Sequence, residues 1–324
     1  MNPTVAAAWI AAGISALTLV GTLAAQYFGR RATSRDTQEA LKEQSKQLDR
    51  TLAEQRTRTL NERFGAAAGQ LGNDKPPEVR LAGVYAMTGL ADDWGENRQT
   101  CVDVLCASLR MPYKPDPGQD ADEEKRLAFQ AIREVRHTVI RVIAAHLKEN
   151  AAVSWQGLNF DFTGVVFDGG SFEHAQFSSG TVNFSNAVFS GGHVDFDEAR
   201  FSGGTVYFDN ARFSSGTVSF YGAEFSGGLV SFFHAEFSGD LVNFSEVVLS
   251  GGFVDFGHAK FSGGLVKFLD AAFSGSTVDF RKARFSGSEV NFSYVVDWSS
   301  PPAFWTEALP AGVKLPKKEN RSEA

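Results

Sequence analysis

Histidines and paired carboxylates are the side chains of this sequence that could bind a metal ion or transfer a proton. His174, His234 and His258 share one position of a sequence repeat, and Asp255 and Asp279 share another. Imidazole nitrogens and carboxylate oxygens are common metal ligands, and two adjacent carboxylates can share one proton. Neighbouring repeats carry Asn, Glu, Gly or Lys at these positions, which is typical of a solvated surface. We therefore predict no catalytic residue, no metal site and no cofactor.

Two cysteines and two further histidines lie in the first half of the chain. Cys101 and Cys106 are separated by about 140° around a helix, so they do not share a face, and we interpret them as buried thiols of a helical core. His137 and His146 point to opposite sides of their predicted helix and are not a ligand pair. Two cysteines also exclude a disulfide scaffold and leave no set of ligands for a structural zinc site.

A 12-residue repeat of the form V-x-F-x-x-A-x-F-S-G-G-x positions the candidate histidines and carboxylates. Of the 29 phenylalanines, 25 lie between Phe160 and Phe292. Their alternating gaps of five and seven residues fit a chain that turns a corner after each inward-facing side chain, which is a β-solenoid. The Ser-Gly-Gly segments lack the lysine and the following helix of a phosphate-binding loop. The predicted core consists of Phe172, Phe177, Phe184, Phe189, Phe196, Phe201, Phe208, Phe213, Phe220, Phe225, Phe232, Phe237, Phe244, Phe256, Phe261, Phe268, Phe273, Phe280, Phe285 and Phe292, with Leu249 in one phenylalanine position.

Charges along the repeat decide the length of one coil. Residues one coil apart stack about 4.8 Å from each other, so like charges there repel. A 12-residue coil would stack Arg200 on Arg212 and Glu224 on Glu236, whereas a 24-residue coil alternates Arg212, Glu236 and Lys260 and pairs Arg200 with Glu224. We therefore predict a mainly β fold with about six coils of 24 residues over residues 151–297.

Consecutive Val-x-Phe-x-x and Ala-x-Phe-x-x units resemble the pentapeptide-repeat family, with two extra residues after each pair. The resemblance covers residues 151–297 and implies a right-handed quadrilateral β-helix. The segments 63–72 and 79–86 are similar to a helical stretch that precedes the repeats of bacterial, membrane-anchored members. Some members of the family resemble DNA and bind type II topoisomerases, which makes a DNA-mimicking topoisomerase modulator an alternative function.

An uncharged, apolar run at residues 4–28 is long enough to span a bilayer, and we interpret it as a transmembrane helix in contact with lipid. A cleaved signal peptide is the competing interpretation, but no basic residue precedes the run. Arg30, Arg31 and Arg35 follow the run, so the positive-inside rule predicts a single-pass protein of the cell membrane. Its N-terminus would lie outside and its bulk in the cytoplasm.

Helical patterns fill the region between the predicted anchor and the repeats. Residues 29–66 predict a membrane-proximal stalk, either a solvated helix or a coiled coil that would make the protein a homodimer. Residues 67–150 predict a small α-helical domain with helices at 78–93, 98–110 and 122–149. Each of these helices has an apolar stripe, so together they can bury a small core.

The last segment, residues 298–324, predicts an apolar cap followed by a charged tail. Trp298, Phe304 and Trp305 would cover the final coil. Residues 151–296 carry 7 basic and 15 acidic residues, which argues against direct nucleic-acid binding. We expect a non-enzymatic, membrane-anchored module whose solenoid face binds a protein partner as a scaffold. A β-helix enzyme that acts on a glycan is a more remote alternative.

Overall fold

The computed structural model describes residues 3–114, 116–304 and 310–316, with the backbone alone described for residues 3–19 and 28–36. The chain divides into two compact units, residues 1–62 and residues 63–324. The long helix α1 (Pro3–Gln70) forms the first unit and continues into the second.

Helix α1 contains the predicted stalk. Leu41, Leu48 and Leu52 are 64%, 58% and 54% exposed, so no described residue of this unit covers the leucine row. Within the residues that the structure describes, no helix combines the length and apolar character needed to cross a membrane. Most of the predicted span, residues 4–19 and 28, lies outside the residues whose side chains are described.

A small helical domain follows α1 and confirms the three predicted helices. Its helices are α2 (Pro77–Asp93), α3 (Arg98–Arg110) and α4 (Glu123–Leu147), with a short 3-10 turn at Gly95–Asn97. Helix α4 begins after Asp122, whose side chain accepts a hydrogen bond from the backbone N–H of Lys125 at 2.8 Å. The buried apolar residues of the three helices form one core, which includes Val84, Met87, Leu90, Val102, Leu105, Val139, Ile140 and Ile143.

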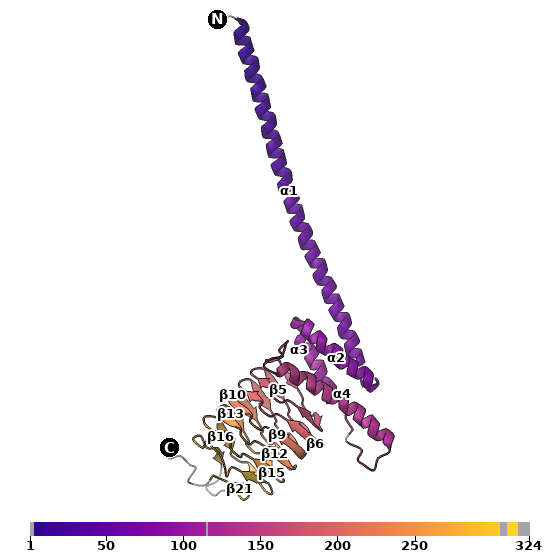
Figure 1. Cartoon of the computed structure of the whole chain (residues 1–324), viewed down its shortest axis with the longest axis vertical. Coiled ribbons are helices and arrows are strands. Elements are labelled where there is room, and N and C mark those ends of the chain that lie inside the picture. The colour runs from indigo at the N-terminus through magenta and orange to yellow at the C-terminus, as the bar shows by residue number, and fades with distance from the viewer. Residues whose placement is uncertain (1–2, 115, 305–309, 317–324) are drawn as a thin grey trace. The chain divides into compact units, whose positions relative to one another are not determined.

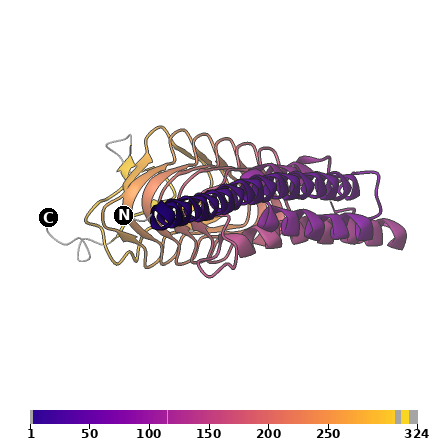
Figure 2. The ribbon, with the colours of Figure 1, turned by 90° about the horizontal axis from the view of Figure 1, so that it is seen from above.

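The rest of the chain is a parallel β-solenoid of about six coils (Figures 1 and 2). Val230 pairs with Val254, and Phe213 pairs with Phe237, so one coil contains 24 residues, as predicted. Its strands are β1 (Phe160–Asp161), β2 (Val166–Phe167), β3 (Gly170–Ser171), β4 (Gln176–Phe177), β5 (Thr181–Asn183), β6 (Val188–Asp195), β7 (Arg200–Phe201), β8 (Thr205–Tyr207), β9 (Arg212–Ser219), β10 (Glu224–Ser231), β11 (Glu236–Phe237), β12 (Leu241–Asn243), β13 (Val248–Asp255), β14 (Lys260–Phe261), β15 (Leu265–Lys267), β16 (Ala272–Phe273), β17 (Thr277–Phe280), β18 (Arg284–Phe285), β19 (Glu289–Asn291), β20 (Ala303–Phe304) and β21 (Val313–Lys314).

Four columns of stacked phenylalanines fill the solenoid. Within a column, ring centroids of successive coils are separated by distances such as 4.8 Å between Phe208 and Phe232 and 4.7 Å between Phe232 and Phe256. The predicted core phenylalanines are buried, except that Phe285, near the C-terminal end, is half-buried. Phe162 and Phe167 begin two of the columns, although the sequence pattern did not single them out.

Each V-x-F-x-x-A unit makes a tight turn between two faces. The backbone N–H of Ala187 donates to the carbonyl of Phe184 at 3.0 Å, and Asn186 between them has a φ of +59°. A positive φ at the third residue of a turn defines type II. The side chain of Asn183 accepts a hydrogen bond from the N–H of Ser185 at 2.9 Å, which fixes the entrance to the turn.

The C-terminal end departs from the predicted cap. Phe304 lies in β20, pairs with Phe280 and continues its column at a ring distance of 5.2 Å, so it extends the solenoid instead of covering it. The predicted boundary at residue 297 was therefore too early, because the coil continues without the V-x-F pattern. Trp298 contacts the ring edges of Phe273 and Phe292, as expected of a capping residue. Trp305 and the tail after residue 316 lie outside the described residues.

The helical domain covers the N-terminal end of the solenoid, where α3 packs on β1 and α4 packs on β3 (Figure 1). The indole of Trp155 is fully buried, stacks on His146 at 4.0 Å and donates to Asp92 at 3.0 Å. This contact joins the first residues of the solenoid to two helices of the domain.

Candidate interaction surface

The histidines that share one repeat position lie on two different edges of the solenoid. His174 belongs to a column with Glu198 and Glu246, whereas His234 and His258 belong to the column that starts with Asn186. In the part of the chain that the structure describes, no three His, Cys, Asp or Glu side chains are arranged to hold a metal ion.

The two cysteines and the two histidines of the helical domain have structural surroundings, as the sequence indicated. Cys101 and Cys106 are both fully buried, and burial raises the pKa of Cys106 to about 12, so its reactive thiolate is scarce near neutral pH. His146 contacts Asp92, whereas His137 contacts Asp168 at 3.0 Å. The two histidines therefore belong to separate clusters.

Asp168 is the centre of a polar cluster between the helical domain and the solenoid. The hydroxyl of Tyr113 donates a hydrogen bond to the carboxylate of Asp168 at 2.6 Å, and the Nε of Arg133 donates to it at 3.1 Å. The Nε2 of His137 lies 3.0 Å from the same carboxylate. Burial by itself raises the pKa of Asp168, but the hydrogen bonds and the charges of His137 and Arg133 outweigh it and hold that pKa below its usual value. The cluster fixes the first coil on α4.

Asp168→Asn is expected to lower the free energy of unfolding by about 1–3 kcal/mol near neutral pH, because three half-buried groups, Tyr113, Arg133 and His137, lose their charged acceptor. Since the folded pKa of Asp168 is lowered, its carboxylate stabilises the folded state above its unfolded pKa near 4, and this contribution disappears as the pH falls through the folded pKa. Urea unfolding of both proteins should show a constant difference above about pH 5 that shrinks below about pH 4. A difference that persists unchanged in acid would contradict the assignment.

The edge that contains His234 and His258 carries an exposed aromatic cluster. The ring of Phe233 lies 4.4 Å from that of His234 and 5.3 Å from that of His258. Asp255 and Asp279 are stacked beside it in register, as predicted. Burial, together with the charge of Asp279, raises the pKa of Asp255, whereas Arg281 lowers the pKa of Asp279 through hydrogen bonds. The carboxylates of Asp255 and Asp279 therefore have different surroundings.

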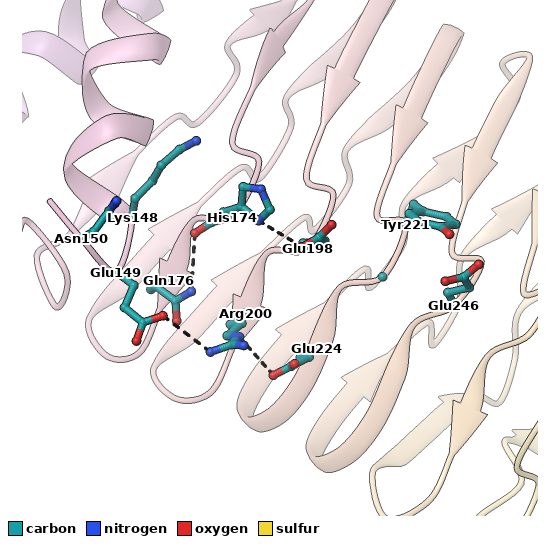
Figure 3. A pocket seen from close by; sticks show the side chains of 11 residues that line it. Lys148, Glu149, Asn150, His174, Gln176, Glu198, Arg200, Tyr221, Glu224 and Glu246 are labelled. Atoms are coloured by element: carbon teal, nitrogen blue, oxygen red, sulfur yellow. Dashed lines mark hydrogen bonds and ion pairs between the residues drawn. The ribbon is translucent and has the colours of Figure 1, made fainter.

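The opposite edge carries a groove with a volume of about 600 Å³ (Figure 3). The residues that line it come from the segment directly after α4 and from four successive coils. They are Lys148, Glu149, Asn150, His174, Gln176, Glu198, Arg200, Tyr221, Gly222, Glu224 and Glu246. Four glutamates against one lysine and one arginine make the groove acidic.

Ion pairs join neighbouring coils along the groove. Arg200 lies 3.3 Å from Glu224 on the next coil and 3.9 Å from Glu149 after α4 (Figure 3). The Nδ1 of His174 lies 3.3 Å from Glu198. Arg200 is thus flanked by two glutamates, and the acidic excess falls on the turn residues Glu198 and Glu246.

Arg200→Glu is expected to destabilise the protein by about 0.5–1 kcal/mol more than Arg200→Ala, because the new carboxylate would lie beside Glu224 on the next coil. Both side chains are partly exposed, so the effect is small and should weaken in high salt. Urea unfolding at two salt concentrations measures it. Equal stabilities of the two variants at low salt would argue against the pairing of these residues.

The sequence predicted one ion pair of this groove but not the groove itself. The 24-residue coil placed Arg200 beside Glu224, which the structure confirms. Lys148, Glu149 and Asn150 were missed because their position depends on how α4 packs against the first coil. Tyr221 was missed because aromatic residues at turn positions vary between repeats, and its 38% exposure is a property of the folded coil.

A family model described as pentapeptide repeats (9 copies) matches residues 191–236, which lie within the central coils. No match was found among curated proteins or among solved structures.

Proposed function

Because this chain belongs to the pentapeptide-repeat family, we propose that it is a non-enzymatic scaffold whose acidic groove binds a basic segment of a protein partner. The observation that carries the proposal is the groove itself, where Glu198 and Glu246 face solvent on a rigid edge. Rigid, preorganised charges bind a complementary partner with little loss of conformational freedom.

Several features support a solenoid that serves as a fixed surface. The stacked core holds successive coils in register, so groups on one edge keep constant spacing. The four phenylalanine columns also favour the four-sided coil implied by the family resemblance. The apolar run at residues 4–28 supports attachment to the cell membrane with the solenoid in the cytoplasm.

The DNA-mimicking alternative has less support. A DNA mimic needs continuous rows of negative charge at phosphate spacing. Here Arg200 interrupts the row that contains Glu224, and Arg212 and Lys260 flank Glu236. Rows of alternating sign do not reproduce the uniform negative charge of a DNA backbone.

Charge reversal in the groove tests the proposed binding. The full chain carrying Glu198→Lys and Glu246→Lys should recover at least tenfold less of its partner from the native host than the wild type. The matched control is Asn186→Lys with Asn210→Lys, which changes the same turn position on the opposite edge. The control should stay within twofold of the wild type, and equal loss in both variants would refute a role of the groove.

Cell fractionation tests the proposed anchor separately. The wild type should remain with membranes after an alkaline wash, and a chain that lacks residues 2–28 should become soluble. Protease added outside intact cells should leave residues 30–324 intact. Digestion of this region would contradict a cytoplasmic solenoid.

A further inference from the structure

The helical domain contains a second cavity, distant in sequence from the acidic groove and formed by different residues. It has a volume of about 390 Å³ and lies between the start of α2, the segment after α3 and the first half of α4. Its walls are mainly apolar and include Pro112, Tyr113, Phe129 and Ile132. This size and lining are typical of small-molecule sites, which combine apolar walls with a few polar groups.

Arg80 lines this cavity and is 4% exposed. Its Nε has no hydrogen-bond partner, and its Nη1 makes a long contact of 3.3 Å with Asn73. Among the described residues no carboxylate forms an ion pair with it, and burial alone lowers its pKa. A buried guanidinium without a counter-charge is energetically costly, so a bound anion would stabilise it.

Arg136 shows how a buried arginine of the same domain is normally satisfied. Its guanidinium donates to the carbonyls of Leu109 at 2.7 Å and Val166 at 2.8 Å and lies over the ring of Tyr113. Arg80 has none of these partners, although the two side chains are almost equally buried. The difference indicates that the guanidinium of Arg80 is available for a ligand.

The charges around the cavity point to an anion as well. Lys114 and Lys125 also line it, and no described lining residue is an aspartate or a glutamate. We propose that this cavity binds an amphiphilic anion, with its carboxylate or phosphate head on Arg80 and its apolar body against Phe129 and Ile132. A medium-chain fatty acid has this chemistry, and a single-chain alkyl phosphate shares it.

Isothermal titration calorimetry on the full chain in a neutral detergent tests the site. The probes are decanoate, decyl phosphate, uncharged 1-decanol and inorganic phosphate. We expect decanoate or decyl phosphate to bind at least tenfold more tightly than 1-decanol, and the stronger of the two identifies the head group. Equal binding of the charged and uncharged decyl compounds would overturn the proposal, and so would inorganic phosphate that binds as tightly as either amphiphile.

Two variants separate the head-group contact from the apolar contact. Arg80→Met should reduce the preference for the charged probe to less than twofold, and it should remain folded because an apolar side chain replaces an uncompensated charge. Ile132→Trp should fill the cavity and weaken all decyl compounds. Arg141→Met is the matched control, since Arg141 lies on α4, pairs with Glu134 and does not line the cavity. The role of Arg80 would be refuted if Arg80→Met kept the preference for the charged decyl probe over 1-decanol. It would also be refuted if Arg141→Met lost this preference.

Discussion

Phe232→Ala is expected to lower the free energy of unfolding by about 3–5 kcal/mol, because it leaves a cavity in the middle of a stacked column. The ring of Phe232 is fully buried, and its centroid lies 4.8 Å from that of Phe208 and 4.7 Å from that of Phe256. It also contacts the edge of Phe220 at 6.0 Å. Removal of the ring therefore weakens three coils at once, in a fold where each coil contacts only its neighbours.

Two other variants give the scale for this effect. Phe285→Ala should cost clearly less, since Phe285 is half-buried near the C-terminal end. Phe225→Leu should cost about 1 kcal/mol, because Leu249 already occupies the next position of the same column. Urea unfolding of the full chain measures all three. Equal losses for Phe232→Ala and Phe285→Ala would contradict a core built from stacked columns.

Gly228→Ala is expected to cost about 2–5 kcal/mol, from backbone strain and from a steric clash between coils. Gly228 has a φ of +70°, a conformation that a side chain disfavours. A Cβ atom there would lie 2.5 Å from the carbonyl oxygen of Gly204 on the preceding coil. Since that atom belongs to the backbone of a packed coil, it cannot move aside without separating the strands.

Gly222→Asn is the matched control for this prediction. Gly222 also has a positive φ, of +63°, but the nearest atom to an added Cβ is the flexible Glu198 Cγ at 3.5 Å. Asn186 and Asn210 occupy the same turn position with nearly the same φ. We expect Gly222→Asn to change stability by less than about 1 kcal/mol. If thermal unfolding gave equal losses for both variants, contact between coils at Gly228 would not be the cause.

Much of this fold follows from the sequence because its core repeats. The spacing of the phenylalanines predicted the corners, and the signs of Arg200, Glu224 and Glu236 predicted the 24-residue coil. The C-terminal boundary was wrong because Phe304 continues a column without its repeat motif. The last coil pairs with the preceding one through β20 and β21, and Phe304 has no neighbouring Val-x-Phe motif that would have indicated this pairing.

The turn positions show a limit of reasoning from residue types. His174, Asn186 and Glu198 look freely variable in the sequence, which suggests an unconstrained surface. The structure shows that they all have a positive φ, so the backbone constrains these positions although the side chains differ. Asn tolerates this conformation well, whereas Glu and Lys accept it at some cost in stability.

Only the pairing of Arg200 with Glu224 in the groove was predicted from the sequence, and the cavity was not predicted, for a related reason. Both depend on how the helices pack at the end of the solenoid, and that packing uses contacts between distant residues. Asp168 with His137, and Asp92 with Trp155, are such contacts. The local sequence pattern around one residue of such a contact does not identify the residue that it contacts.

Site-specific photo-crosslinking in the native host tests the groove most directly. A photoreactive phenylalanine analogue is placed at Tyr221 in the groove or at Phe233 on the opposite edge. The two residues share one repeat position and are 38% and 36% exposed, so they form a matched pair. The proposed function predicts a discrete crosslinked partner from position 221 that is lost with Glu198→Lys and Glu246→Lys, and none from position 233. Equal crosslinking from both positions, or from position 233 alone, would contradict the groove as the binding surface.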